Sequence, residues 1–217
     1  TGHTARYAGC SFPWVGASTA LAVGDHDDIV RPDGARPGDD LVLTTGPAVE
    51  ATALFASLFP EQIDCDKVVL DRVAARLDDL DAVRDAQAAV DAGAVTAMHD
   101  VTEGGLLGAL HEMAAGAGVE FAVDRASVPT DPDVEALCET LGMDRWRATS
   151  SGSLLVAVDP DSTAEVVEAL RARGTTAAVI GRADTGSGVV IDGESTEPPE
   201  GDSSWPVYEA LLDGATN

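Results

Sequence analysis

Apolar residues follow two different spacings along the chain. Between residues 48 and 92 they recur three and four positions apart, which is typical of helices. The second half alternates short β-branched runs with further helical patterns. The helices predicted in this way cover 48–59, 68–77, 82–92, 106–115, 133–141 and 162–173. The predicted strands cover 95–98, 119–123, 153–158, 177–180 and 188–191. Such alternation indicates a layered body of helices and strands.

The two ends of the chain have weaker patterns. The small-residue apolar run 12–23 predicts a strand, whose edge we expect to be open to pairing with another copy. A connector rich in Asp, Gly and Pro follows over 25–40, and 39–45 predicts a second strand. After Gly193 the chain is expected to be irregular until a short turn at 205–212. A domain boundary is expected between the first two strands.

Charge limits the possible partners. The 217 residues include 25 Asp and 13 Glu against 12 Arg and a single Lys, for a net charge of −25. Basic residues are scattered singly, so the chain lacks the clustered cations that nucleic acids and anionic membranes require. Self-repulsion at this charge is relieved in molar salt, where the Debye length is about 3 Å. We therefore expect a salt-loving host and no binding to nucleic acid or membranes.

The cysteines and the start of the chain indicate the cellular compartment of the protein. Cys10, Cys65 and Cys138 lie far apart and form no CxxC pair, which argues against a disulfide framework or a zinc ribbon and favours the cytoplasm. No apolar run approaches the ~20 residues of a membrane span. The chain begins at Thr1 without Met and has no secretion signal, so it is interpreted as a fragment.

The segment from His99 to Gly105 gathers ionisable residues and glycines between a predicted strand and a predicted helix. A helix N-terminus preceded by glycines can bind phosphate through backbone amides, and Asp100 and Glu103 could hold Mg²⁺ through oxygen. The structural alternative is that Thr102 caps the helix, Glu103 interacts with the helix dipole and the glycines only turn the chain. Spacing alone leaves both open.

Other candidates have plainer interpretations. His111 is expected to pack in the core, and Asp39–Asp40 to form a solvated loop in so acidic a protein. Trp146 and Trp205 are expected to serve core or lid packing. Ser150 to Gly152 predicts a turn with spare hydroxyls, and no nucleophile-elbow spacing accompanies it.

Five motifs occur in the order known from one superfamily. They are Gly2-His3-Thr4, Pro37-Gly38-Asp39-Asp40-Leu41-Val42-Leu43-Thr44, the stretch from Val95 to Leu106, Ser151-Gly152-Ser153-Leu154-Leu155, and Ala178-Val179-Ile180-Gly181-Arg182. Together they resemble the PurM-like superfamily, which includes aminoimidazole ribonucleotide (AIR) synthetase, thiamine monophosphate kinase and the hydrogenase-maturation carbamoyl dehydratases. Within it, the likeness is greatest to the carbamoyl dehydratases.

The resemblance implies an α+β fold, with an α/β/α body around a mixed sheet and a remnant strand of an N-terminal domain. Residues 1–36 would end that ATP-binding domain, and 37–217 would form the AIR synthase-related C-terminal domain. The implied cofactors are ATP and Mg²⁺, with the nucleotide held mainly by the missing domain of a homodimer. The implied site has catalytic His3 and His99, metal ligands Asp100 and Glu103, and substrate- or phosphate-binding Thr4, Asp100, Thr102, Glu103, Gly104, Gly105 and Ser151.

The implied function is ATP-dependent activation of an amide, carbamoyl or similar oxygen by phosphorylation. Two departures weaken the likeness to the carbamoyl dehydratases. No cysteine follows Cys138, whereas those enzymes end in one, and Ser151 stands where they carry a Glu. The alternative is therefore a non-catalytic paralogue that keeps the fold to bind a metabolite or partner. The fragment alone is not expected to turn over ATP.

Overall fold

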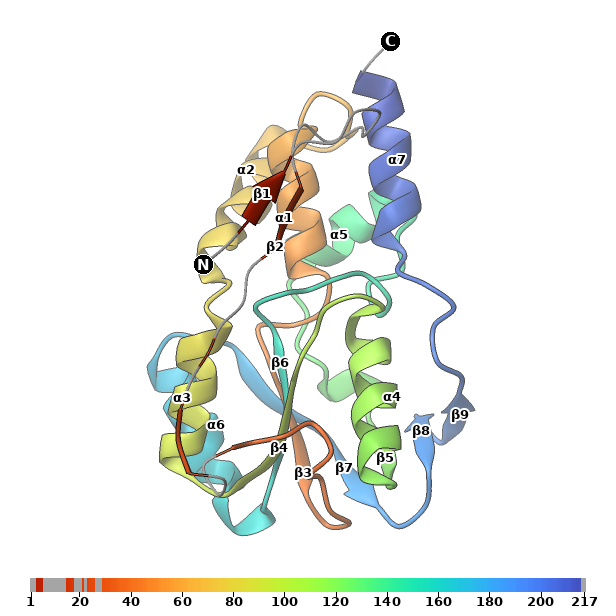
Figure 1. Cartoon of the computed structure of the whole chain (residues 1–217). Coiled ribbons are helices and arrows are strands. Elements are labelled where there is room, and N and C mark those ends of the chain that lie inside the picture. Colours follow the sequence, from red (N-terminus) through yellow and green to blue (C-terminus); the bar gives the residue numbers. More distant parts are fainter. Residues whose placement is uncertain (1–2, 6–14, 18–20, 22, 26–28, 216–217) are drawn as a thin grey trace.

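Seven strands form one sheet in the computed structural model, which describes residues 3–5, 15–17, 21, 23–25 and 29–215 (Figure 1). In sheet order they are β4 (Val95–Asp100), β6 (Leu154–Val158), β3 (Asp40–Thr44), β7 (Ala177–Asp184), β5 (Glu120–Val123), β8 (Gly188–Ile191) and β9 (Glu194–Thr196). Only β5 and β8 pair in parallel; the other neighbours are antiparallel. The predicted α+β class and mixed sheet are confirmed.

Alternation along β3 divides the core between the two faces of the sheet, because successive side chains of a strand point to opposite faces. Leu41 and Leu43 belong to the cluster under α4 (Gly105–Ala117), whereas Val42 belongs to the cluster under α3 (Ala82–Ala92) and α6 (Thr163–Ala172). All three side chains are fully buried. The sheet therefore lies between α4 on one face and α3 with α6 on the other (Figure 1).

Four further helices pack together beyond one end of the sheet (Figure 1). They are α1 (Val49–Leu58), α2 (Lys67–Ala75), α5 (Pro132–Leu141) and α7 (Ser204–Ala215). Asp66 and Asp131 cap α2 and α5 by accepting from the amides of Val68 and Asp133. A separate core of mainly aliphatic residues with Phe55 and Phe59 holds these helices together. No helix of the described chain is long and apolar enough to cross a membrane.

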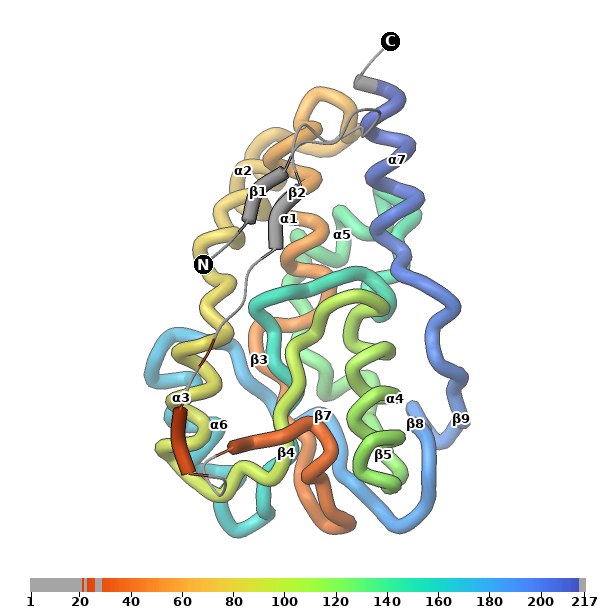
Figure 2. The backbone as a smooth tube through the Cα atoms, in the orientation of Figure 1, coloured from red at the N-terminus to blue at the C-terminus, as the bar shows by residue number. Residues whose placement is uncertain are grey.

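The predicted helices and inner strands are confirmed, and the predicted irregular tail is confirmed only for residues 197–203. Residues 194–196 form the edge strand β9, and the short turn predicted at 205–212 is the twelve-residue helix α7. Figure 2 shows the tail running from β9 alongside α4 to α7. The tail is ordered by tertiary packing, since Leu211 of α7 joins the core of α1, α2 and α5.

At the N-terminal end, β1 (His3–Ala5) pairs with β2 (Val15–Ala17) as a separate antiparallel ribbon. Of the strand predicted over 12–23, only 15–17, 21 and 23 lie within the described residues. The domain boundary after residue 36 stays a prediction.

Candidate functional site

The turn from Val101 to Gly105 is clamped to a second turn, Ser150 to Ser153. The Val101 amide donates to the Ser153 carbonyl, and the Ser150 amide donates to the Val101 carbonyl, both at 3.0 Å. Val101 is fully buried between them. The structure thus brings together two of the stretches that carried the resemblance.

Glycines at the start of α4 are required by the backbone. Gly104 and Gly105 have φ of 80° and 62°, where only glycine is free of strain. A Cβ on Gly105 would also lie 2.7 Å from the carbonyl oxygens of Trp146 and Ala148. The Leu107 amide donates to that Trp146 carbonyl at 2.9 Å, so the helix start is seated on the 146–148 segment.

The first amides of α4 are not capped by Thr102, so this part of the structural alternative is wrong. Gly104 holds the cap position and has no side chain to offer. Its amide donates instead to the Asp202 carboxylate at 2.9 Å, across 98 residues of sequence. The other Asp202 oxygen accepts from the Ser204 amide at 2.8 Å at the start of α7. A phosphate at this turn would have to displace Asp202 from the Gly104 amide.

His99 lies at the end of β4 with both ring nitrogens engaged. Nε2 is 2.8 Å from Oε2 of Glu112 on α4, and Nδ1 is 2.6 Å from the Asp100 carbonyl oxygen. Both partners accept hydrogen bonds, so the ring satisfies both contacts only when each nitrogen carries a proton. The Glu112 pairing orients the imidazole, and sequence reasoning missed it.

Asp100 and Glu103 are both exposed, and the Asp100 carboxylate also lies 3.2 Å from Nδ1 of His99. Within the described residues, no three His, Cys, Asp or Glu side chains are grouped to hold a metal. Mg²⁺ commonly takes only one or two protein carboxylates and completes its shell with phosphate oxygens and water. The two carboxylates suit that mode, and their role as ligands stays a prediction.

The hydroxyl of Ser150 is not spare, contrary to expectation. It is buried, donates to the Gly46 carbonyl at 3.0 Å and accepts from the Val49 amide at 3.1 Å. Ser153 donates to the same Gly46 carbonyl at 2.7 Å. These contacts fix the 150–153 turn against the start of α1.

Glu50 is a site residue that sequence reasoning missed. One of its carboxylate oxygens accepts from the Ser151 amide at 2.8 Å and from the Thr149 hydroxyl at 2.9 Å. It lies in the first turn of α1, where the helix dipole favours a negative charge. A carboxylate therefore lies beside Ser151, supplied by another element.

His3 and Thr4 lie in β1, opposite Ala17 and Gly16 of β2. Their predicted roles stay predictions.

A cavity of about 430 Å³ opens beside the turn, between α4 and the tail. Three of its polar side chains, Glu103, Glu112 and Asp202, are acidic, and His111 also lines it. His111 is half-buried, with Nε2 3.0 Å from the Thr196 hydroxyl. Burial lowers the pKa of His111, and the charge of Glu197 opposes that shift. His111 therefore lines a cavity wall rather than being wholly packed in the core.

The burial of Asp39 and of the two tryptophans decides two other expectations. Asp39 is not in a solvated loop: it is buried and accepts from the Thr96 hydroxyl at 2.6 Å and from the Arg36 amide at 2.8 Å. Trp146 is a core residue with Arg125 stacked 4.7 Å above its ring, whereas Trp205 is half-exposed on α7.

The family is shown by comparison with known proteins. The model for "AIR synthase related protein, C-terminal domain" matches residues 36–194, and the chain belongs to this family. The resemblance to the PurM-like superfamily is thereby confirmed.

Individual relatives carry different activities. Carbamoyl dehydratase HypE of Rhizobium leguminosarum bv. viciae is 32% identical over 154 residues, covering 70% of this chain and 42% of the relative. Thiamine-monophosphate kinase of Halobacterium salinarum is 34% identical over 181 residues, covering 80% of this chain and 56% of the kinase. The chain thus spans about half the length of these relatives.

A solved structure has the same fold. Hydrogenase maturation protein HypE in complex with ATP superposes with a TM-score of 0.61 at 19% identity, covering 80% of this chain and 53% of that chain. This likeness concerns the fold alone.

Proposed function

We propose that this chain is the C-terminal half of an ATP-dependent enzyme that activates an amide, carbamoyl or similar oxygen by phosphorylation. Residues 1–36 would end the N-terminal domain that holds most of the nucleotide, and the full-length protein would act as a homodimer in the cytoplasm. ATP, bound with Mg²⁺, would supply the phosphoryl group. The substrate would be a small molecule or a carbamoyl-type group.

The observation that carries this proposal is the meeting of three loops at one end of the sheet. Leu43 of β3 and His99 of β4 both lie opposite Leu155 of β6, so both strands end on the same side. The loops that follow β3 and β4 are joined through the turn before β6 by the buried contacts of Ser150 and Ser153. Such loop clusters at strand ends are usual places for ligand sites.

The residues of this end have distinct proposed roles. His99 would be a catalytic residue, with Nε2 held by Glu112 and Nδ1 released from the Asp100 carbonyl when the substrate binds. Thr102, Glu103 and Gly104 would line the substrate side, and Glu50 would supply the carboxylate beside Ser151. His3 and Thr4 would approach from the domain junction.

A specific observation favours the second candidate function, a non-catalytic paralogue that binds a metabolite or partner. Asp202 occupies the Gly104 amide that a phosphate would use, and the adjoining cavity is lined by further carboxylates. Carboxylates at these positions disfavour an anionic substrate. Ser151 in place of a glutamate points the same way.

Calorimetric titration of Mg²⁺-ATP separates the two functions. It would be run in molar KCl on the full-length protein, on the 217-residue chain and on a full-length His99→Ala variant. The enzyme proposal expects saturable binding by the full-length protein, none by the 217-residue chain, and ATP hydrolysis that is lost in His99→Ala while ATP binding persists. A Lys67→Ala variant, which changes a side chain in an exposed ion pair on α2, is the control. No binding by the full-length protein would contradict the enzyme proposal and favour the paralogue.

A further inference from the structure

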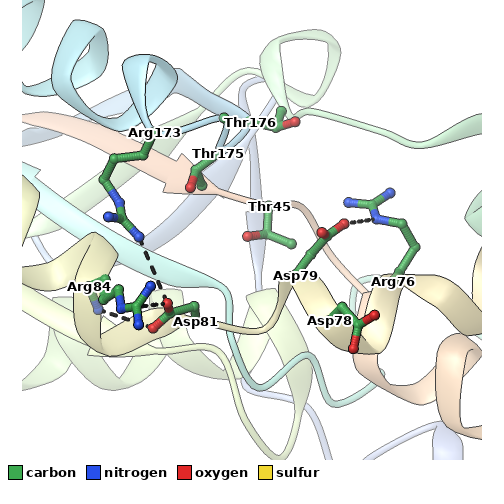
Figure 3. Close-up of a pocket in the computed structure, with 10 residues that line it drawn as sticks. Thr45, Arg76, Asp78, Asp79, Asp81, Arg84, Arg173, Thr175 and Thr176 are labelled. Carbon is green, nitrogen blue, oxygen red and sulfur yellow. Dashed lines mark hydrogen bonds and ion pairs between the residues drawn. The ribbon is translucent and has the colours of Figure 1, made fainter.

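A second cavity, of about 260 Å³, lies on the other face of the sheet, where α3 and α6 pack. Its lining comes from four separate segments: the end of β3, the turn between α2 and α3, the start of α3, and the loop between α6 and β7. Figure 3 shows this arginine cavity, named for Arg76, Arg84 and Arg173 in its wall. These are three of only twelve arginines in a chain of net charge −25. Gathering them in one cavity makes this part of the surface unlike the rest.

Buried or partly buried carboxylates hold two of the arginines in place. Asp85, almost fully buried on α3, accepts from Nε of Arg173 at 3.0 Å and from the Thr175 hydroxyl at 2.8 Å. Arg76 is paired with Asp131 at the start of α5 and with Asp79. Guanidinium groups fixed in this way lose little entropy when they bind a ligand.

Each guanidinium keeps donors for a ligand. The Nε of Arg84 lies 3.3 Å from Asp81, and among the described residues its two terminal nitrogens have no hydrogen-bond partner. Arg173 similarly binds Asp85 through Nε, and its terminal nitrogen Nη2 is 3.9 Å from Asp81. An arginine has five N–H donors, so several remain for an oxyanion.

The Thr45 hydroxyl is the most telling group in the wall. Thr45 is 7% exposed, and its hydroxyl has no partner within the described chain. Figure 3 shows this hydroxyl between the Arg173–Asp81 side and the Arg76–Asp79 side of the cavity. The hydroxyl oxygen is not itself buried, because it is open to the space of the cavity, where an atom of a ligand can reach it.

The backbone at Thr45 is also strained. Its φ is 60°, in the left-handed region that is rare for a β-branched residue. The Thr45 amide donates to the Thr176 carbonyl at 2.7 Å, which ties this conformation to the loop that carries Arg173 and Thr175. Strain of this kind persists where the surrounding structure enforces it, and it is common at ligand sites.

We propose that the arginine cavity binds a phosphate group, held by the guanidinium groups of Arg84 and Arg173 and by the Thr45 hydroxyl. Figure 3 shows Arg84 and Arg173 together on one side of Thr45, and Arg76 on the other side. A tetrahedral anion with several oxygens suits two guanidinium groups and a hydroxyl, and the small volume limits the ligand to inorganic phosphate or a small phosphate monoester. Asp78, Asp79 and Asp81 also line the cavity, so the charge of its wall is balanced. Asp81 is 42% exposed and can turn to water when phosphate takes its arginines. This proposal stands independently of the proposed function.

The test is calorimetric titration of the 217-residue chain in molar KCl with inorganic phosphate and, separately, with ribose 5-phosphate. Arg84→Gln, on a side chain that is 71% exposed, is expected to weaken binding about tenfold, because it removes a charged hydrogen-bond donor from the cavity. Thr45→Val keeps the shape, removes only the hydroxyl, and is expected to weaken binding by a similar factor. The matched control is Arg182→Gln, an exposed arginine with a single aspartate partner elsewhere on the sheet.

Saturable phosphate binding that Arg84→Gln weakens and Arg182→Gln leaves unchanged supports the proposal. Tighter binding of ribose 5-phosphate than of phosphate would identify a phosphorylated metabolite as the ligand, and the reverse order would identify free phosphate. No saturable binding of either compound would overturn the proposal. So would equal weakening by Arg84→Gln and Arg182→Gln, which would show a general charge effect. Thermal unfolding of each variant checks that Thr45→Val and Arg84→Gln still fold.

Discussion

The turn before α4 and the arginine cavity lie at the same end of one sheet, on opposite faces. They differ in whether their hydrogen-bond donors are already paired within the chain. At the turn, the Gly104 amide is paired by Asp202, and the adjoining cavity is lined by carboxylates. At the arginine cavity, the guanidinium groups of Arg84 and Arg173 keep N–H donors without hydrogen-bond partners among the described residues, and the Thr45 hydroxyl lines the same space. The turn carries the sequence motif, yet the cavity has the groups that bind an oxyanion.

A sequence motif and a set of groups able to bind a ligand are therefore separate properties of the chain. The spacing of glycines determines whether a turn can expose a backbone amide to a ligand, and this spacing can be read from the local sequence. Whether that amide is free depends on groups far along the chain.

Replacing the buried Asp85 with Ala is expected to have the largest effect. It removes the buried carboxylate that Arg173 and Thr175 share, and losing two hydrogen bonds to a charged group costs about 3 kcal/mol of unfolding free energy. Chemical denaturation measures the change. Asp91→Ala, an exposed position on the same helix, is the control and should stay within about 0.5 kcal/mol of wild type. Equal small losses in both variants would contradict the view that the arginine cavity is anchored.

Gly105→Ala is expected to cost about 2 to 3 kcal/mol, because it combines a left-handed backbone with collisions against the carbonyls of the 146–148 segment. Gly118→Ala separates the two causes: its φ is 68°, but nothing lies within 4 Å of the added Cβ. Strain alone there should cost about 1 kcal/mol. Equal losses of unfolding free energy in the two variants would show that the contacts between the turn and residues 146–148 contribute nothing to stability.

Asp202→Ala is expected to cost about 1 kcal/mol, the usual effect of losing a helix cap. Glu200→Ala, an exposed neighbour, is the control for thermal unfolding. The variant also tests the difference between the turn and the arginine cavity, because it frees the Gly104 amide. If Asp202 is what closes the turn to anions, phosphate should perturb the Gly104 amide in Asp202→Ala and not in wild type.

A small pH effect is expected from His111. Burial lowers its pKa in the folded state below the ordinary value of 6.5. The unfolded chain then binds the proton more readily, so this residue's effect is absent well above pH 6.5 and destabilises the fold as pH falls through 6.5. Unfolding temperatures at pH 7.5 and 5.5 should differ more for wild type than for His111→Gln. An equal or larger difference in the variant would contradict this assignment.

Much of the fold could be predicted from the sequence because its signals are local. Spacing of apolar residues located every helix from α1 to α6 and the inner strands, and β8 has the predicted bounds. The tail was missed because β9 is short and exposed, and α7 is ordered by packing of residues such as Leu211 against distant helices. Tertiary packing therefore determines the secondary structure where the spacing of apolar residues does not.

The site could be predicted only in part, for the same reason. The turn and its glycines were visible in sequence, and the left-handed backbone at Gly104 and Gly105 agrees with them. Glu112, Asp202 and Glu50 act through contacts across 13, 98 and 101 residues, and no local signal marks them. The arginine cavity likewise combines four segments that are unremarkable one by one.

The most direct measurement is the mapping of backbone amide chemical shifts by NMR as inorganic phosphate is added to the 217-residue chain in molar KCl. The account predicts that the amides of Thr45, Gly174 and Thr175 around the arginine cavity shift saturably, while those of Gly104 and Gly105 stay in place. Saturable shifts at Gly104 and Gly105, with none around Thr45, would contradict it.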